Sequence, residues 1–188
     1  MSATLARRIQ QIFPLSAPAQ ALLLASAQLL RLKRKQFFLQ EGKICRHIGF
    51  IEIGSLRAYA LMDGKEINTA FYLENNFATN LKSLRNITPS EQYIQAMEDT
   101  HLWLLAKEDL VLLYKQYAEL ESFGRHLLEG LVIEQEEQAQ LFRLYTPEER
   151  YLYMETHYPA LLQRISQSQL ASYLGIARET ISRIRRRR

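Results

Sequence analysis

The chain has 188 residues, 47% of them hydrophobic and 10% aromatic, which is enough to build the core of one large domain or two small ones. This composition argues against intrinsic disorder, and no apolar run approaches the roughly 20 residues that a membrane-spanning helix needs. The residues after Met1 predict a short amphipathic helix, not the long apolar core of a signal peptide. Cys45 is the only cysteine, which excludes an intramolecular disulfide and a cluster held by four thiolates. We therefore expect a cytoplasmic protein with no membrane association.

The N-terminal segment predicts helices. The pattern of residues 5–30 is helical throughout. Ser16-Ala17-Pro18 is typical of a helix start with proline in the first turn, and a run rich in leucine and alanine follows from Ala19 to Leu30. From Lys33 onward the pattern changes to that of strands.

The segment that follows predicts short strands separated by glycine-containing turns. The expected strands cover residues 37–39, 48–53, 56–61, 67–72, 93–97 and 102–105. Asp63-Gly64 lies between two of them, and this dipeptide favours a tight hairpin turn. Short strands at regular spacing predict an antiparallel roll or barrel.

Helical signals return at Lys107, and a long helix is expected from about Leu120 to Leu144. The apolar residues on one side of its first half are Leu120, Phe123, Leu127 and Leu131, and after a polar middle the stripe resumes with Leu141, Phe142 and Leu144. This stripe fits a dimer seam and equally fits packing against the chain's own roll, and helix periodicity alone does not separate the two. Thr146-Pro147-Glu148-Glu149 predicts the start of another helix, because it combines an N-cap, a proline and an acidic first turn. Tyr158-Pro159 is expected to end that helix.

The residues from Ser166 to Ile184 predict a helix-turn-helix. Residues 167–174 have helical character, with Leu170 and Leu174 one turn apart on one face. Gly175 follows, and glycine takes a positive φ at a helix C-terminus without a Cβ clash. In the second helix Ile176, Ile181 and Ile184 fall on one face and can close a shared core. The side chains left pointing outward are Arg178, Glu179, Ser182, Arg183 and Arg186.

This outward face has the chemistry of a DNA-reading surface. Arginine donates a pair of hydrogen bonds to guanine, and glutamate can accept one from the amino group of cytosine. Residues 176–188 contain six arginines and one glutamate, a formal charge of +5, so the rest of the chain carries −1 of the total of +4. The basic charge is thus confined to the last helix, where phosphate contacts are expected. We interpret the segment as a double-stranded-DNA-binding element.

These motifs resemble the Crp/Fnr superfamily of bacterial transcription regulators. The stretch from Gly175 to Ile184 resembles the family's Gly-x-Ser-Arg-Glu-Thr-Val-x-Arg-x turn and recognition helix, and residues 53–66 resemble a strand and hairpin of its roll. The resemblance implies an α+β fold, with an N-terminal antiparallel, jelly-roll-like β-roll and flanking helices, a long dimerisation helix and a C-terminal helix-turn-helix. The corresponding domains are a cyclic-nucleotide-binding-like sensor roll (1–118), the dimerisation helix (119–145) and the DNA-binding domain (146–188).

The resemblance also implies a homodimer that binds a two-fold symmetric operator, with RNA polymerase as a candidate partner. It carries over Arg178, Glu179 and Arg183 as base readers, and Ser168 and Thr180 as contacts to the DNA backbone. Ser182 and Arg186 complete the expected DNA-binding set because they lie on the same outward face. The alternative function is a ligand-sensing roll, for a cyclic nucleotide or another metabolite, whose helix-turn-helix makes protein contacts.

The sequence departs from the family in the phosphate cassette. Nucleotide-binding members hold the ribose with a Gly-Glu pair and the cyclic phosphate with an arginine followed by serine or threonine. The corresponding stretches here are residues 77–81 and 89–93, which lack the Gly-Glu pair and have Glu91 where the cation should be. A carboxylate repels a phosphate, and Arg85 is a candidate substitute for the missing cation from a different position. We therefore expect no tight binding of cyclic AMP and leave the effector open. Residues 159–166 are also too few for a β-hairpin wing before the helix-turn-helix.

Other chemistry has few residues to support it. The four histidines, His47, His101, His126 and His157, are scattered without a His-x-His pair, so we expect no metal site of the kind found in roll-shaped cupin enzymes. Phosphate loops and a serine nucleophile elbow are absent from the sequence. Cys45 beside Arg46 fits a redox sensor, although an inert, half-buried thiol is favoured. We expect a protein that is not an enzyme and carries no cofactor.

Overall fold

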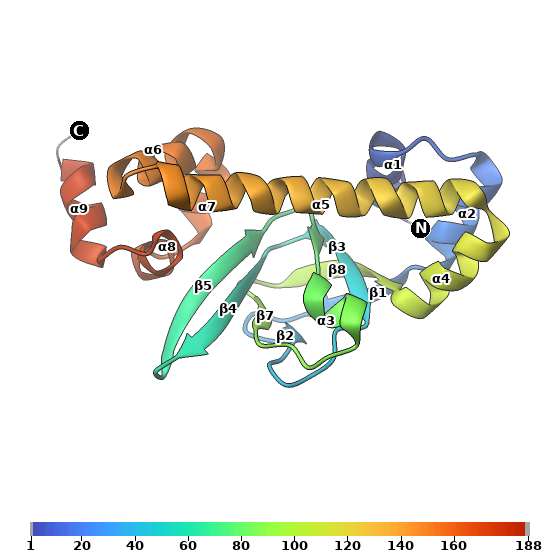
Figure 1. Cartoon of the computed structure of the whole chain (residues 1–188), viewed down its shortest axis with the longest axis horizontal. Helices are drawn as coiled ribbons and strands as arrows, with labels where there is room; N and C mark the ends of the chain where they lie inside the picture. The colour runs from blue at the N-terminus through green and yellow to red at the C-terminus, as the bar shows by residue number, and fades with distance from the viewer. Residues whose placement is uncertain (1, 187–188) are drawn as a thin grey trace.

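The structure, a computed structural model, describes residues 2–186. A long helix, α5 (Ala118–Leu144), runs along one side of the molecule, and a β-roll lies against it (Figure 1). Helices α1, α2 and α4 gather at one end of α5, and α6 to α9 gather at the other. These helices are α1 (Ala3–Ile12), α2 (Ala17–Ser26), α4 (Lys107–Gln116), α6 (Pro147–His157), α7 (Pro159–Arg164), α8 (Gln167–Leu174) and α9 (Arg178–Arg186).

The roll consists of two four-stranded antiparallel sheets, with strand orders β1-β8-β3-β6 and β2-β7-β4-β5. The strands are β1 (Gln28–Leu32), β2 (Phe37–Leu39), β3 (His47–Ile53), β4 (Leu56–Met62), β5 (Lys65–Tyr72), β6 (Phe77–Ala78), β7 (Tyr93–Ala96) and β8 (Thr100–Ala106). The expected hairpin is present: Met62 pairs with Lys65 across Asp63 and Gly64, which both have positive φ. The short helix α3 (Leu81–Asn86) connects β6 to the loop before β7.

The N-terminal segment forms helices as expected, but helix does not extend as far along the chain as the sequence predicted. Ser16 caps α2 through its hydroxyl, and proline lies in the first turn, as predicted. The expected helix does not continue to Leu30, however, because residues from Gln28 onward form β1. Leu29 pairs with Trp103, so antiparallel pairing with β8 overrides the local helical pattern.

The larger hydrophobic core joins the roll to α1, α2, α4 and the first half of α5. Buried residues of the paired strands β3 and β8 include Phe50, Ile51 and Leu102. From α5, the predicted stripe enters this same core, with Leu120, Phe123 and Leu127 buried and Leu131 packed against it. The first half of the stripe therefore packs against its own chain, the second of the two alternatives that periodicity had left open; in the second half Leu141 is buried and Leu144 is exposed. At Gly124 a Cβ atom would collide with the Tyr114 hydroxyl, so glycine lets α4 and α5 approach closely.

A second hydrophobic core holds the C-terminal helices together. It contains Tyr151 and Met154 of α6, Leu161 of α7, Leu170, Ala171 and Leu174 of α8, and Ile181 and Ile184 of α9. Helix α6 begins at Thr146 with a capping box to Glu149, as predicted, and ends at His157. The sequence did not predict α7, which begins at Pro159 immediately after the expected stop. Within residues 2–186, no helix is both long and apolar enough to cross a membrane.

Candidate nucleic-acid interface

The first helix of the helix-turn-helix, α8, has well-defined ends. The Ser166 hydroxyl accepts a hydrogen bond from the Gln169 N–H at 3.1 Å, and the Gln169 side chain accepts one from the Ser166 N–H at 2.9 Å. This reciprocal capping box satisfies donors that the helix cannot pair internally. At the other end Gly175 has φ +67°, and the Ile176 N–H donates to the Ala171 carbonyl at 3.1 Å. The sequence predicted this sharp turn correctly, and it fixes the direction in which α9 leaves.

Helix α9 is strongly amphipathic. Ile181 and Ile184 are buried in the second core, so the opposite face points to solvent. The predicted DNA contacts that are exposed are Arg178, Glu179, Arg183 and Arg186 of α9 and Ser168 of α8. Thr180 and Ser182 are half-buried. Arg187 and Arg188, the rest of the expected recognition helix, lie outside the described residues.

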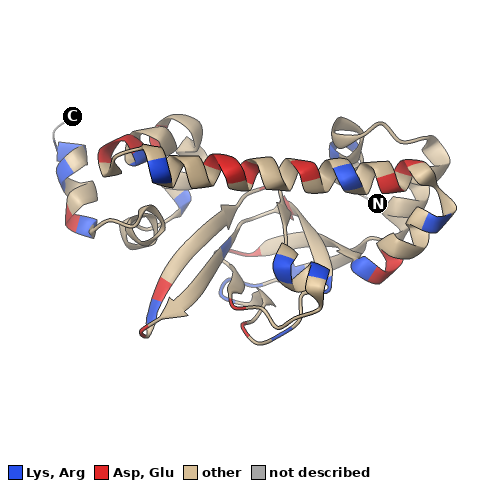
Figure 2. Ribbon diagram, viewed as in Figure 1, with Lys and Arg blue, Asp and Glu red and all other residues tan. Residues whose placement is uncertain are grey.

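The exposed face of α9 gathers positive charge at one end of the molecule. The helix contains four arginines and one glutamate, and Figure 2 shows the basic residues on it. The Arg183 guanidinium donates to the Thr180 hydroxyl at 3.3 Å, so these two side chains lie together one turn apart. A rigid helix with exposed arginines can enter a major groove and donate to base edges and phosphates.

Arg185 has a different environment from its neighbours. Its Nε donates to the Tyr151 hydroxyl at 2.8 Å, and its guanidinium lies 5.7 Å from the centre of the Tyr151 ring. This contact holds α9 against α6 and orients the helix. The sequence suggested only a solvated or phosphate-binding arginine run here, because Tyr151 is 34 residues away along the chain.

A second arginine, Arg150 of α6, connects three elements. Its guanidinium donates to the carbonyls of Phe142 at 2.8 Å, Tyr145 at 3.0 Å and Leu174 at 3.1 Å, and it lies 5.1 Å from the centre of the Phe142 ring. The first two carbonyls are at the end of α5 and the third is at the end of α8, where helices leave acceptors unpaired. Arg150 therefore fixes the helix-turn-helix to the end of the long helix.

We expect Arg150→Ala to lower the free energy of unfolding by about 2–3 kcal/mol, because three carbonyls lose a charged donor. Arg143→Ala is the matched control, since Arg143 is exposed on α5, and it should change stability by less than about 0.5 kcal/mol. Urea unfolding followed by circular dichroism measures both values. Equal effects of the two substitutions would contradict the role assigned to Arg150.

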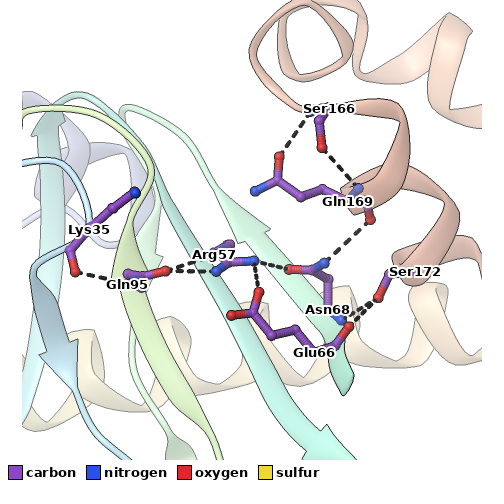
Figure 3. Close-up of polar contacts among 8 residues, drawn as sticks. All are labelled: Lys35, Arg57, Glu66, Asn68, Gln95, Ser166, Gln169 and Ser172. Atoms are coloured by element: carbon purple, nitrogen blue, oxygen red, sulfur yellow. Dashed lines mark hydrogen bonds and ion pairs between the residues drawn. The ribbon is translucent and has the colours of Figure 1, made fainter. Parts of the chain in front are cut away.

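The helix-turn-helix also contacts the roll through the β4–β5 hairpin (Figure 3). The Ser172 hydroxyl of α8 accepts from the Asn68 N–H at 3.0 Å and donates to the Glu66 carbonyl at 2.9 Å. The Glu66 carboxylate pairs with Arg57 at 2.6 Å, and Arg57 also donates to Gln95 at 2.7 Å. This network runs from the second sheet of the roll into α8, so the two parts of the chain are mechanically connected.

An ion pair strengthens the same junction. The Arg164 guanidinium at the end of α7 donates twice to the Glu74 carboxylate, at 2.7 and 2.9 Å. Partial burial of the Glu74 carboxyl acts to raise its pKa, but the hydrogen bonds and charge of Arg164, together with backbone hydrogen bonds, outweigh burial and lower the pKa of Glu74. Because Glu74 and Arg164 are 90 residues apart, local sequence patterns gave no signal for this contact.

In the stretch that corresponds to the phosphate cassette, polar side chains form hydrogen bonds with one another and with the backbone. The Asn80 side chain accepts from the Ser83 N–H at 3.0 Å and donates to the buried Ser90 hydroxyl at 2.9 Å. Glu91 pairs with Lys82 on the surface at 2.7 Å. Arg85 is exposed on α3.

Cys45 is buried, with its sulfur 3.4 Å from both the His47 carbonyl and the Thr79 hydroxyl. Burial limits its access to oxidants and favours the inert interpretation. Among residues 2–186, no group of three or more His, Cys, Asp or Glu side chains is arranged to hold a metal ion.

Comparisons with known proteins agree with this architecture. Residues 29–117 match the family model described as the cyclic nucleotide-binding domain. The chain is similar to FixK2 from Bradyrhizobium japonicum, with a TM-score of 0.71 and 20% identity over 86% of this chain and 83% of that one. It is also similar to a putative transcriptional regulator of the Crp/Fnr family from Eubacterium rectale, with a TM-score of 0.70 and 21% identity over 94% of this chain and 86% of that one. A third similar structure is the catabolite activator protein of Thermus thermophilus, with a TM-score of 0.59 and 20% identity over 94% of this chain and 84% of that one. None of the curated proteins matches the chain.

The fold is a β-roll joined by a long helix to a helix-turn-helix. Residues 29–117 are similar to the cyclic nucleotide-binding domain, and the chain has the fold of the three solved structures named above over 86–94% of its length. The α+β architecture and the family resemblance that the sequence predicted are thereby confirmed.

Proposed function

We propose that the protein is a cytoplasmic, DNA-binding transcription regulator of the Crp/Fnr type and not an enzyme. The observation that carries the proposal is the outer face of α9, where arginines are exposed while Ile181 and Ile184 anchor the helix in a core. Two similar structures, described as a transcriptional regulator and a catabolite activator protein, support the assignment. In this proposal residues 1–118 form the sensor domain, residues 119–145 the dimerisation helix and residues 146–188 the DNA-binding domain.

The proposed DNA contacts divide into two kinds. Arg178, Glu179 and Arg183 meet base edges in the major groove and select the sequence. Ser168, Thr180 and Arg186 contact the phosphates and set the register, and Ser182 lies between the two groups. These roles are supported by the exposure of Ser168 and of the three arginines and Glu179, and by the resemblance of this stretch to the family motif; Thr180 and Ser182 are half-buried.

The proposed homodimer forms through the α5 seam, which we define as Leu128, Val132 and Ile133. These apolar side chains are 42%, 56% and 55% exposed and lie on successive turns of a helix whose other face is buried in the roll. Exposed apolar residues in a continuous helical stripe are typical of a helix that pairs with a second copy. A two-fold axis along α5 would place one α9 in each of two successive major grooves, about 34 Å apart.

We further propose that the regulator does not bind cyclic AMP tightly. The cassette region lacks the expected buried cation, and its buried polar groups are already paired within the chain. At the expected cation position Glu91 carries the wrong sign of charge.

The proposed function predicts sequence-selective, salt-sensitive DNA binding without added nucleotide. A duplex selected from a random library and a scrambled duplex are compared by fluorescence anisotropy at two salt concentrations. Selective binding that weakens with salt supports a regulator. Weak binding with equal affinity for both duplexes contradicts it and favours a helix-turn-helix that contacts protein.

A further inference from the structure

A cavity of about 430 Å³ lies between the roll, α5 and the C-terminal helices. Its walls come from β5, the segment around β6, the second half of α5, and α6, α7 and α8. This volume is within the range of about 300–1,000 Å³ that small-molecule sites occupy. The cavity therefore lies where one bound molecule would touch both the sensor roll and the DNA-binding helices.

The charged residues among its described lining are Glu134 and Glu137, and no lysine, arginine or histidine lines it. Within residues 2–186, neither carboxylate has an ion-pair partner within salt-bridge distance. Glu134 and Glu137 are both exposed residues, and partial burial raises the pKa of Glu134, with the Glu137 charge adding to this effect and Arg8 on α1 partly offsetting it. Because both carboxylates line the cavity and neither has an ion-pair partner in the described part of the chain, a cation bound there would stabilise their charge.

Tyrosines supply the other distinctive part of the lining, namely Tyr72, Tyr153, Tyr158 and Tyr173. Burial is the main reason that the pKa of Tyr72 and of Tyr173 rises to about 12, and it also raises the pKa of Tyr158. All three hydroxyls therefore remain protonated and neutral at physiological pH. Neutral tyrosine side chains add no charge to the lining, and the faces of aromatic rings attract cations.

The walls are held in place before any ligand arrives. The Tyr173 ring packs edge-on against Phe71 and Phe142, with centroids 5.3 and 5.7 Å away. The Gln138 side chain donates to the Thr69 carbonyl at 2.8 Å and to the Tyr173 hydroxyl at 3.1 Å, so α5, β5 and α8 meet at this wall. A preformed wall lowers the entropic cost of binding.

We propose that this cavity binds a small organic cation, an amine or quaternary ammonium with an apolar body. The carboxylates neutralise the charge, the tyrosine faces contact it, and the apolar wall, including Leu131, Leu141 and Met154, covers the rest of the molecule. The same lining repels anions, including phosphates. That the ligand acts as the effector of transcription rests on the proposed function, whereas binding in the cavity does not.

The test uses three probes that share one aromatic body and differ in charge: 2-phenylethylammonium, 2-phenylethanol and phenylacetate. Isothermal titration calorimetry on the full chain at millimolar probe concentration should show saturable binding of the cation. We expect roughly tenfold weaker binding of the neutral alcohol and no binding of the anion. Equal affinity for the cation and the alcohol, or no saturable binding of the cation, overturns the proposal.

A double variant, Glu134→Gln with Glu137→Gln, locates the site. It should lower the affinity for the cation at least about tenfold and leave the affinity for 2-phenylethanol unchanged. Glu129→Gln is the matched control, because Glu129 is exposed on the same helix and does not line the cavity. An unchanged cation affinity in the double variant overturns the proposal, provided that circular dichroism shows the variant to be folded.

DNA binding is measured separately on the same preparations. Cation binding without sequence-selective DNA binding would refute the proposed function and leave the site intact. Selective DNA binding without cation binding would refute the site and leave the regulator intact.

Discussion

Replacing Arg178 or Arg183 with alanine is expected to lower affinity for the specific DNA site by about 5- to 150-fold, which corresponds to about 1–3 kcal/mol for each. Both guanidinium groups are on the exposed face of α9, and each can donate two hydrogen bonds to a guanine edge. Fluorescence anisotropy with the selected duplex and with single-base variants of it would measure the loss. Base preference should relax only at the position that the removed arginine reads.

The matched control for this experiment is Arg186→Ala, which removes an exposed arginine from the same helix. A phosphate contact carries no sequence information, so this change should weaken binding to all duplexes alike. It should also reduce the slope of log affinity against log salt concentration by about 1. If Arg178→Ala behaved in the same way as Arg186→Ala, Arg178 would be a phosphate contact and the proposed reading face would be wrong. Thermal unfolding should be unchanged in all three variants, because none of these side chains belongs to the core.

Local chemistry explains why so much of the helix-turn-helix could be predicted from the sequence. The turn depends on one residue, Gly175, whose positive φ is costly for other side chains, and the spacing of Ile181 and Ile184 decides which face of α9 is buried. The β4–β5 hairpin follows in the same way from Asp63-Gly64. These signals lie within a few residues of the structure that they determine.

The parts that the sequence did not predict depend on distant partners. Gln28–Leu32 becomes a strand only because β8 lies beside it, and no pattern within the segment shows this. Arg150 and Ser172 look like ordinary surface residues of helices, yet they connect α8 to α5 and to β5. The cavity is hidden for the same reason, because its carboxylates and tyrosines come from β5, α5, α6 and α8. Placing such residues together requires the tertiary fold.

The long helix α5 has one feature that local sequence predicts and one that depends on the tertiary fold. The first half of its predicted stripe, which begins at Leu120, is buried in its own chain, whereas the α5 seam is exposed. The sequence pattern indicated one apolar stripe with two possible partners. The structure shows two apolar faces, one packed internally and one exposed, so internal packing and dimerisation do not compete for the same residues.

The α5 seam is therefore expected to be required for specific DNA binding. In the double variant Leu128→Lys with Val132→Lys, two charges would face each other across the two-fold axis, and burying them would be costly. We expect a folded monomer by sedimentation equilibrium, with affinity for the palindromic site lowered about 10²–10⁴-fold, because the second half-site no longer binds a linked subunit. Stability of the monomer fold should change little, since both side chains are already exposed.

The matched control is Val111→Lys with Leu112→Lys, two exposed apolar residues of α4 that lie outside the seam. This variant should keep the oligomeric state and the DNA affinity of the unmodified protein. If it dissociated and the seam variant did not, the dimer would form through α4. A seam variant that stayed dimeric would show that α5 is not the interface, and the half-site spacing of one helical turn expected from pairing along α5 would no longer follow.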